Sequence, residues 1–313
     1  MRFGAAVGGV ETRSESAPDA VRRWLSGGPG RFVLTRDEPD YPPFLLHLND
    51  PPPVLFGAGR RDLLQVPALA IVGSRNATEQ GKCDARAFSG HLTRVGYCIV
   101  SGMARGIDSA AHWGALEAGG GTIAVLGTGI DVVYPPSNRP LAEALARDGL
   151  LIAEFPPGMG VRRDHFPRRN RIIAALARGV LVAEATLRSG SLITARWAAD
   201  LGREVFALPG SIHSPMHRGC HRLIRDGAKL VESAQDIFEE FHDGGAPNPP
   251  VQPSRAGLGE DRRLAAMGYD PVDLDTLAAR LREDPGSLAA ALLELELMRK
   301  VERLPGNRYQ RLA

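Results

Sequence analysis

Short apolar runs alternate with amphipathic segments along the middle of the chain. The apolar runs cover residues 68–72, 97–100, 122–126, 150–153, 180–183, 204–207 and 229–231. Between and after them, helical periodicity predicts helices at about 79–94, 108–118, 138–147, 168–177, 190–201, 217–226 and 233–241, with Thr78, Asp108 and Asn138 as caps. Strands that are apolar throughout and alternate with helices belong to parallel sheets covered on both faces. The pattern predicts an α/β fold, an extended Rossmann-like doubly wound mostly parallel sheet.

The two ends of the chain follow other patterns. Residues 1–35 show weak periodicity, with one amphipathic piece at 18–25, and 36–67 form a proline-rich stretch read as an extended arm. We therefore separate a short N-terminal segment, 1–35, from a Rossmann-like domain, 36–241. Residues 242–258 have the composition of a linker. Residues 259–313 show three short helical pieces and a hairpin around 305–307, the outline of a small winged-helix domain.

Composition narrows the class of protein. The chain has 313 residues, 43% of them hydrophobic, as expected for a globular protein. Its three cysteines form no CxxC pair, so neither a disulfide framework nor a zinc ribbon is indicated. Scattered cysteines of odd number fit a reduced, cytoplasmic setting best. No apolar stretch approaches 18 residues, so we expect no membrane span.

Basic charge is concentrated in one third of the chain. Residues 160–230 contain 13 Lys or Arg against 5 Asp or Glu, although the net charge of the whole chain is only +2. Such an asymmetry suggests a surface that faces a polyanion, and an arginine-rich solvated face is the alternative.

The loops after the predicted strands are rich in glycine, Ser, Thr and Arg. Ligands of such sheets sit at the carboxyl ends of the strands, and glycine lets backbone N–H groups approach an anion closely. The glycine pair 127 and 129 lacks the third glycine of a dinucleotide site, and Gly81-Lys82 lacks the earlier glycine of a P-loop. We therefore expect phosphate binding without a nucleotide cofactor.

Residues 161–171, VRRDHFPRRNR, place five arginines around one phenylalanine. Arginines for phosphates and an aromatic ring for stacking are typical of proteins that bind single-stranded nucleic acid. The alternative is that Phe166 anchors the loop in the core while the arginines are solvated.

Catalytic and metal sites are weakly indicated. Asp108, Asp131, Glu154 and Glu184 fall near strand ends, where a nuclease or glycosidase would use them, but they could equally cap helices or pair with buried arginines. His217 and His221 are one helical turn apart without a neighbouring Cys or Asp, so we expect no metal.

Eight blocks of sequence resemble one family. They are IVGSRNAT, SGMARGIDSAAHWGAL, LGTGIDVVYPPSN, LIAEFPPG, HFPRRNRIIAALA, EATLRSGSLITARWA, ALPGSIHSP and RGCHRLIRDGAKLV. Together, over residues 36–240, they resemble the DNA-processing protein A family, called DprA or Smf. The end of the chain is similar to the family's winged helix.

The resemblance implies a protein that is not an enzyme. Members of the family bind single-stranded DNA without sequence preference, form homodimers, load RecA during natural transformation and recombination, and assist replacement of single-strand-binding protein. The implied DNA-binding residues are Gly73, Ser74, Arg75, Ser101, Gly102, Arg105, Gly106, Ile107, Asp108, Arg162, Arg163, Phe166, Arg169, Asn170, Arg171, Ser189 and Gly190. The implied dimer and RecA contacts are His217, His221, Ile224 and Leu230.

Two departures from the family pattern stand out. The helical SAM-like domain with which members often begin is missing or truncated in residues 1–35. The recognition-helix segment 287–298 is apolar, with Glu294 and Glu296 and no base-reading Arg or Asn, so we expect it to contact protein or the Rossmann-like domain.

An enzyme of the same superfamily is the alternative. The cytokinin-activating phosphoribohydrolases, called LOG or lysine-decarboxylase-like proteins, also use a GSR-like loop. They need a PGGxGTxxE loop with a catalytic glutamate, where this chain has EATLRSGS at 184–191.

Overall fold

A nine-stranded sheet forms the centre of the protein. The computed structural model describes residues 17–241, 261–269 and 271–312, so the predicted linker at 242–258 lies outside the described residues. The strands are β1 (Arg31–Thr35), β2 (Val54–Gly59), β3 (Ala68–Val72), β4 (Cys98–Ser101), β5 (Thr122–Gly129), β6 (Leu150–Phe155), β7 (Gly179–Val182), β8 (Glu204–Ala207) and β9 (Lys229–Leu230). Their order is β1-β2-β6-β5-β4-β3-β7-β8-β9. All pairings from β6 to β9 are parallel, which confirms the predicted doubly wound fold.

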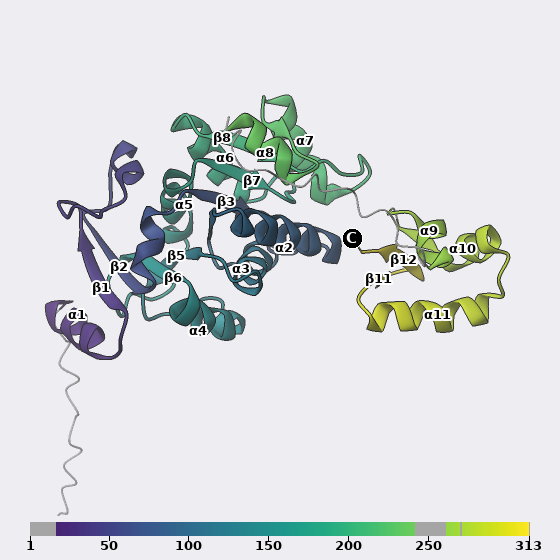
Figure 1. Cartoon of the computed structure of the whole chain (residues 1–313), viewed down its shortest axis with the longest axis horizontal. Helices are drawn as coiled ribbons and strands as arrows, with labels where there is room; N and C mark the ends of the chain where they lie inside the picture. The colour runs from purple at the N-terminus through teal and green to yellow at the C-terminus, as the bar shows by residue number, and fades with distance from the viewer. Residues whose placement is uncertain (1–16, 242–260, 270, 313) are drawn as a thin grey trace, which may run out of the picture.

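Helices cover both faces of the sheet, as the wholly buried strands require. They are α1 (Ala17–Ser26), α2 (Glu79–Arg94), α3 (Ile107–Glu117), α4 (Arg139–Asp148), α5 (His165–Leu176), α6 (Ser191–Asp200), α7 (Arg218–Arg225) and α8 (Ala234–Glu240). Helices α2, α3 and α4 lie on one face and α5 and α6 on the other (Figure 1). Among these helices, none is long and apolar enough to cross a membrane, nor is any other in the described parts of the chain.

The proline-rich stretch is more than an extended arm. Strand β1 pairs antiparallel with β2, and β2 pairs antiparallel with β6, so two strands extend the sheet beyond the parallel core. Strand β1 lies within the N-terminal segment that the sequence set apart. The Phe32 ring of β1 packs directly over Gly57 of β2. A Cβ at Gly57 would stand 2.2 Å from that ring, so only glycine fits at this position.

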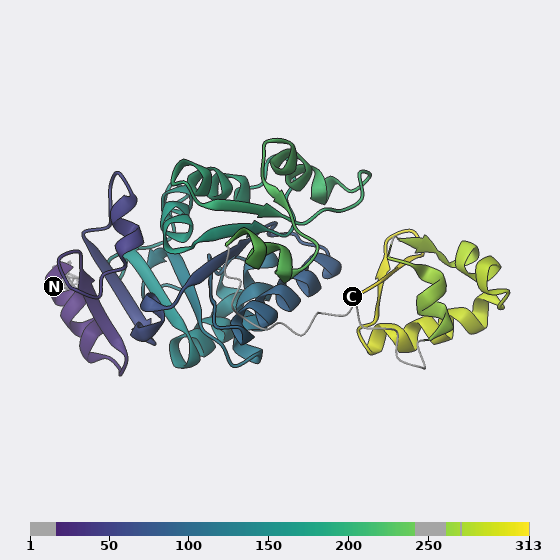
Figure 2. The same cartoon turned by 45° about the horizontal axis from the view of Figure 1, so that its top comes forward.

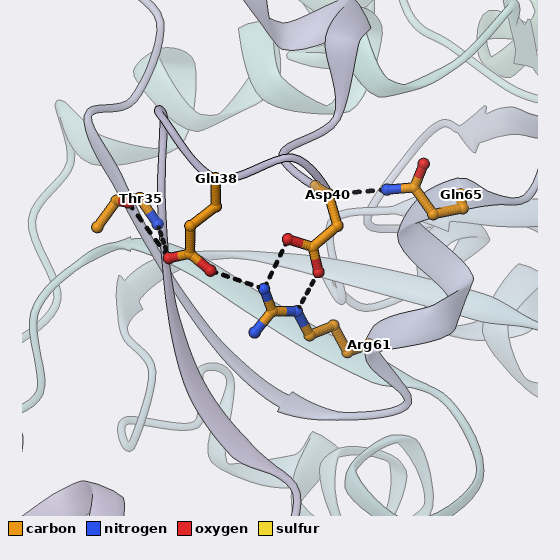
Figure 3. A network of polar contacts seen from close by, with 5 residues as sticks. All are labelled: Thr35, Glu38, Asp40, Arg61 and Gln65. Carbon is orange, nitrogen blue, oxygen red and sulfur yellow. Dashed lines mark hydrogen bonds and ion pairs between the residues drawn. The ribbon is translucent and has the colours of Figure 1, made fainter.

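A network around Arg61 holds the connection between β1 and β2 (Figure 3). The Arg61 guanidinium donates to both carboxylate oxygens of Asp40, at 2.6 and 2.7 Å, and to Glu38 at 2.9 Å. Glu38 in turn accepts from the backbone N–H of Thr35, and the Gln65 amide donates to the carbonyl of Asp40. These contacts lower the pKa of both carboxyl groups and fix the loop to the segment that precedes β3.

The C-terminal domain is a winged helix, as predicted. It contains α9 (Arg262–Met267), β10 (Val272–Asp273), α10 (Leu274–Leu281), α11 (Pro285–Leu297), β11 (Val301–Leu304) and β12 (Arg308–Arg311). Its core is separate from that of the large sheet and is built mainly from leucines of α10 and α11. Figure 2 shows its helices grouped beside the β11–β12 hairpin.

A buried histidine couples the fold to pH. His112, on α3, is fully buried, and its ring Nδ1 lies 2.7 Å from the Thr122 hydroxyl. Because that hydroxyl donates to the carbonyl of Ile99, the Nδ1–H of His112 is the donor to it. Burial lowers the pKa of His112 to about 3.

Stability is therefore expected to fall as the pH falls below the ordinary histidine pKa of about 6.5. The unfolded chain gains a proton at His112 there and the folded protein does not, which costs about 1.4 kcal/mol per pH unit until about pH 3. Urea unfolding at pH 7 and pH 5 should show a loss about 2 kcal/mol smaller in His112→Gln than in the unsubstituted protein. The exposed His213→Gln is the control, and equal losses in all three proteins would contradict the assignment.

Candidate nucleic-acid interface

The sheet reverses its winding between β3 and β7, and two cavities open at that point. In open α/β sheets, ligands bind where the strand order reverses, beyond the carboxyl ends of the strands. The larger cavity, about 840 Å³, lies between the loops after β3 and β7, and the smaller, about 310 Å³, lies beside the loop after β4. They adjoin, because Arg75, Tyr134 and Phe166 line both. We call the pair the switch-point groove.

The structure brings most of the predicted DNA-binding residues into this groove. Those that line it are Gly73, Ser74, Arg75, Gly102, Arg105, Asp108, Arg163, Phe166, Arg169, Asn170, Ser189 and Gly190. Ser101, Gly106, Ile107, Arg162 and Arg171 do not line it. Ser101 and Ile107 are fully buried, and the Ser101 hydroxyl donates to the carbonyl of Ile71 at 2.6 Å.

Four exposed arginines surround the groove. They are Arg75, Arg105, Arg163 and Arg188, from the loops after β3, β4, β6 and β7. In the described parts of the chain, no carboxylate forms an ion pair with any of them. The groove thus has a positive charge that its own walls do not neutralise, and it suits an anion with several phosphates.

Phe166 and Tyr134 supply aromatic surface beside these cations. Their ring centroids are 5.5 Å apart, and the Arg75 guanidinium lies 5.6 Å from the Phe166 centroid. Phe166 also packs on Gly127, where a Cβ would stand 2.8 Å from the ring. Phe166 is therefore half-buried and also lines the groove. It anchors its loop in the protein, as one interpretation of the sequence expected, and it also offers a surface for stacking, as the other expected.

Two buried side chains of opposite charge, Asp108 and Arg169, line the groove and hold the backbone around it. The Asp108 carboxylate accepts from the backbone N–H groups of Gly102 and Ala104, at 3.2 and 3.3 Å. Arg169 donates to the carbonyls of Gly102 (2.8 Å) and Val125. Burial raises the pKa of Asp108 and lowers that of Arg169 to about 10, so Arg169 remains charged near neutral pH.

Gly102 and Gly106 serve this arrangement by lacking side chains. A Cβ on Gly102 would meet Arg169 at 2.6 Å, and one on Gly106 would meet the carbonyl oxygen of Ser74 at 2.2 Å. Gly106 also has a φ of +77°, which other residues rarely adopt. The glycines of this loop thus let other parts of the same chain pack closely against it. The sequence had suggested that they allow the close approach of a phosphate.

One of the three predicted caps is wrong. Asp108 lies in the first turn of α3 and holds the preceding loop, while the N-cap is Gly106 without a side-chain bond. Asn138 is the N-cap residue of α4, as predicted, but its side chain forms no bond to the helix: its amide donates to the Met103 carbonyl and to the Ser109 hydroxyl. Thr78 does cap α2, accepting from the N–H of Gly81.

The arginines of 161–171 separate into different environments. Helix α5 begins at His165, three residues before the predicted start, and its turns direct the arginines to different sides. Arg171 is buried, forms an ion pair with Glu154 and donates to the carbonyl of Asp50 at 2.6 Å. Arg162 is exposed and lies 3.7 Å from Asp164, outside the groove. Arg171 does not line the groove, whereas Arg169 lines it but is buried and donates to protein carbonyls; direct phosphate contacts by these two arginines stay a prediction.

The carboxylates near the strand ends are all engaged. Glu184 is fully buried, and it accepts from the N–H and the hydroxyl of Thr78, at 3.0 and 2.6 Å. Glu154 pairs with Arg168 and Arg171, and Asp131 accepts from the N–H of Gly158. Among the described residues there is no group of three His, Cys, Asp or Glu side chains that could hold a metal ion.

Among the groove residues that the sequence did not predict, Arg188 and Tyr134 matter most, because they add a cation and an aromatic ring. Arg188 lies in the loop after β7, next to the predicted DNA-binding residues Ser189 and Gly190. Its positive charge beside them is the feature of the sequence that points to a phosphate contact. Tyr134 precedes Pro135-Pro136 at the end of the loop after β5, where an aromatic residue in a glycine-rich loop region was the signal.

A third cavity, apolar and of about 670 Å³, lies between α7, β9 and the loops that follow β7 and β8. It is lined by Leu187, Pro209, Ile212, Arg218, His221, Ile224, Arg225 and Leu230. Three of the predicted dimer and RecA residues therefore lie together. The fourth, His217, packs instead on Gly210 and lies 3.1 Å from the Ser214 hydroxyl.

Comparison with known proteins agrees with this architecture. The profile of the DNA recombination-mediator protein A family matches residues 32–242, and that of the DprA winged helix domain matches 246–307. DNA processing protein DprA of Streptococcus pneumoniae is 51% identical over 202 residues, 64% of this chain and 71% of that protein. Protein Smf of Escherichia coli is 41% identical over 299 residues, 92% of this chain and 79% of that protein.

Solved structures give the same result. The S. pneumoniae DprA structure superimposes with a TM-score of 0.65 and 48% identity, covering 68% of this chain and 75% of that one. A Helicobacter pylori DprA structure, which describes that protein's single-stranded DNA binding mode, gives a TM-score of 0.61 and 29% identity, covering 67% and 96%. On this evidence the chain belongs to the DNA recombination-mediator protein A family and carries the DprA-type winged-helix domain.

Proposed function

We propose that this protein binds single-stranded DNA in the switch-point groove without reading its sequence. The supporting observation is the set of four exposed arginines without carboxylate partners, placed beside the rings of Phe166 and Tyr134. Guanidinium groups can contact successive phosphates while the bases stack on aromatic rings. Neither contact depends on the identity of the base, so any sequence can bind. The single-stranded DNA binding described for the H. pylori relative supports the same ligand.

We further propose that the protein acts as a homodimer that loads RecA in transformation and recombination, in the cytoplasm, where its three free thiols remain reduced. The apolar cavity lined by His221, Ile224 and Leu230 is the proposed self-association face, with RecA contacting the same region. Ile212 is 73% exposed and Leu187 53% exposed beside that cavity, an extent of apolar exposure that favours a protein partner.

A non-enzymatic role is part of the proposal. The segment at 184–191, which stands in place of a phosphoribohydrolase's PGGxGTxxE loop, has one carboxylate, Glu184, and it is fully buried and hydrogen-bonded to Thr78. Burial raises its pKa, and its exposed surface is nil, so it cannot reach a substrate in the groove.

Binding of a labelled oligo(dT) across a range of salt concentrations tests the proposal. With three or four phosphate contacts, log K should fall against log salt with a slope of about −2 to −3. An equally long duplex should bind more weakly, and RecA filament formation on DNA coated with single-strand-binding protein should accelerate when this protein is added. Tight binding to duplex alone, or release of free base from nucleoside monophosphates, would contradict the proposal.

A further inference from the structure

Helix α11 has an apolar stripe on the side that faces away from its own domain. Leu288, Leu292 and Leu295 are buried in the winged-helix core. The opposite side carries a stripe of four exposed residues, Gly286, Ala290, Leu293 and Leu297. Leu293 is 55% and Leu297 78% exposed. Their alternating spacing of four and three residues is that of a coiled-coil seam, which makes this face suited to another helix.

The stripe is poorly suited to DNA. In a winged helix, this is the helix that would enter a DNA groove. From Pro285 to Leu297 it contains no Lys or Arg, and it carries Glu294 and Glu296. Phosphates would be repelled by these carboxylates, so a protein helix is the better occupant.

We propose that this stripe is covered by the same stripe of a second copy of this chain, running antiparallel. The side chains change along α11 from small to large, from Gly286 and Ala290 to Leu293 and Leu297. An antiparallel pair can place Gly286 opposite Leu297 and Ala290 opposite Leu293, so each leucine packs over a small residue. A parallel pair would set Leu297 against Leu297 and leave a gap between the two glycines.

Charges at the ends of α11 match the same register. Glu283 and Asp284 precede the helix, and Arg299 and Lys300 follow it. In the antiparallel pair, the acidic start of one helix lies beside the basic end of the other, although Glu283 also pairs with Arg263 at 3.0 Å and Asp284 caps α11 by accepting from the N–H of Ser287. Each end of the pair thus joins opposite charges, and the two helix dipoles oppose each other favourably. A parallel pair would join like charges at both ends, so the self-complementary arrangement is antiparallel.

The contact is small, and this limits where it acts. A seam of two heptads buries less than the roughly 1,000 Å² expected of a stable interface, so it should be weak between free molecules. Neighbours held on one strand have an effective concentration of about millimolar, which is enough to form it. This step rests on the proposed function. A protomer can contact one neighbour through α11 and another through the proposed self-association face at α7. Protomers joined on both sides would bind cooperatively along DNA.

Disulfide trapping in the full chain tests the register without DNA. In a Cys83→Ser background, Gly286→Cys and Leu297→Cys proteins are purified separately, then oxidised alone and mixed. The two positions are 11 residues apart, about 16 Å along a helix, so in the antiparallel pair neither variant can reach its own copy. We expect at least fivefold more dimer in the mixture than in either protein alone. Self-linking of Leu297→Cys alone, or no gain on mixing, would overturn the proposal.

A second measurement uses substitutions that leave the domain core untouched. Leu297→Glu should lower cooperativity on a long oligo(dT) at least tenfold and leave the affinity for an oligonucleotide of one site unchanged. Leu46→Glu, which replaces a leucine 50% exposed on the Rossmann-like domain, is the matched control and should change neither. Unchanged cooperativity in Leu297→Glu would overturn the proposal. If the unsubstituted protein binds no single-stranded DNA, the proposed function fails while the trapping result still decides the contact.

Discussion

Replacing both Arg75 and Arg163 by glutamine is expected to weaken binding of single-stranded DNA by roughly 30- to 100-fold. Both guanidinium groups are exposed at the groove, and neither pairs with a carboxylate in the described parts of the chain. Loss of two phosphate contacts should also reduce the slope of log K against log salt by about 1.4. Fluorescence anisotropy with oligo(dT) at several salt concentrations measures both quantities.

Arg162→Gln is the matched control for this prediction. Arg162 adjoins Arg163 in the chain and is equally exposed, but it lies outside the groove and beside Asp164. Its replacement should change affinity less than threefold, and the melting temperature should not change in any of these proteins. An equal loss in Arg162→Gln would mean that the DNA responds to overall charge and that the groove has no special role.

Replacing Arg169 by methionine is expected to destabilise the protein by about 3–5 kcal/mol. The guanidinium is 4% exposed and is the cation beside the buried carboxylate of Asp108. Methionine would remove the stronger of the two arginine charges that act on that carboxylate, and it would leave two buried carbonyls, those of Gly102 and Val125, without their donor. Urea unfolding monitored by circular dichroism gives the free energy of unfolding.

The neighbouring Arg168 provides the control. It pairs with Glu154 at 2.8 Å, but its side chain is 51% exposed, so Arg168→Met should cost less than about 1 kcal/mol. Adding Asp108→Asn to Arg169→Met should recover part of the loss, since it removes the unpaired charge. Equal unfolding free energies for the Arg168 and Arg169 variants would refute the structural role assigned to the buried Arg169.

The parallel core was predictable because its signal is local. Each of the strands β3 to β9 is a short apolar run between helical segments, and the sequence placed all of them close to their observed bounds. Strands β1 and β2 escaped prediction because prolines surround them, and because their place in the sheet depends on pairing with β6, about ninety residues further along the chain. The prolines indicate the loops beside these strands, but they do not indicate that β2 pairs with β6.

The sequence by itself determined the fold class, the basic segment, the glycine-rich loops and the family resemblance. Only the tertiary structure decided which arginines face the groove. Arg163, Arg169 and Arg171 lie within nine residues and look alike in the sequence, yet one is exposed and two are buried. The acidic residues beside these two buried arginines come from other elements: Asp108, near Arg169, lies in α3, and Glu154, which pairs with Arg171, lies in β6. An arginine's availability for phosphate depends on such distant neighbours, and folding alone brings them together.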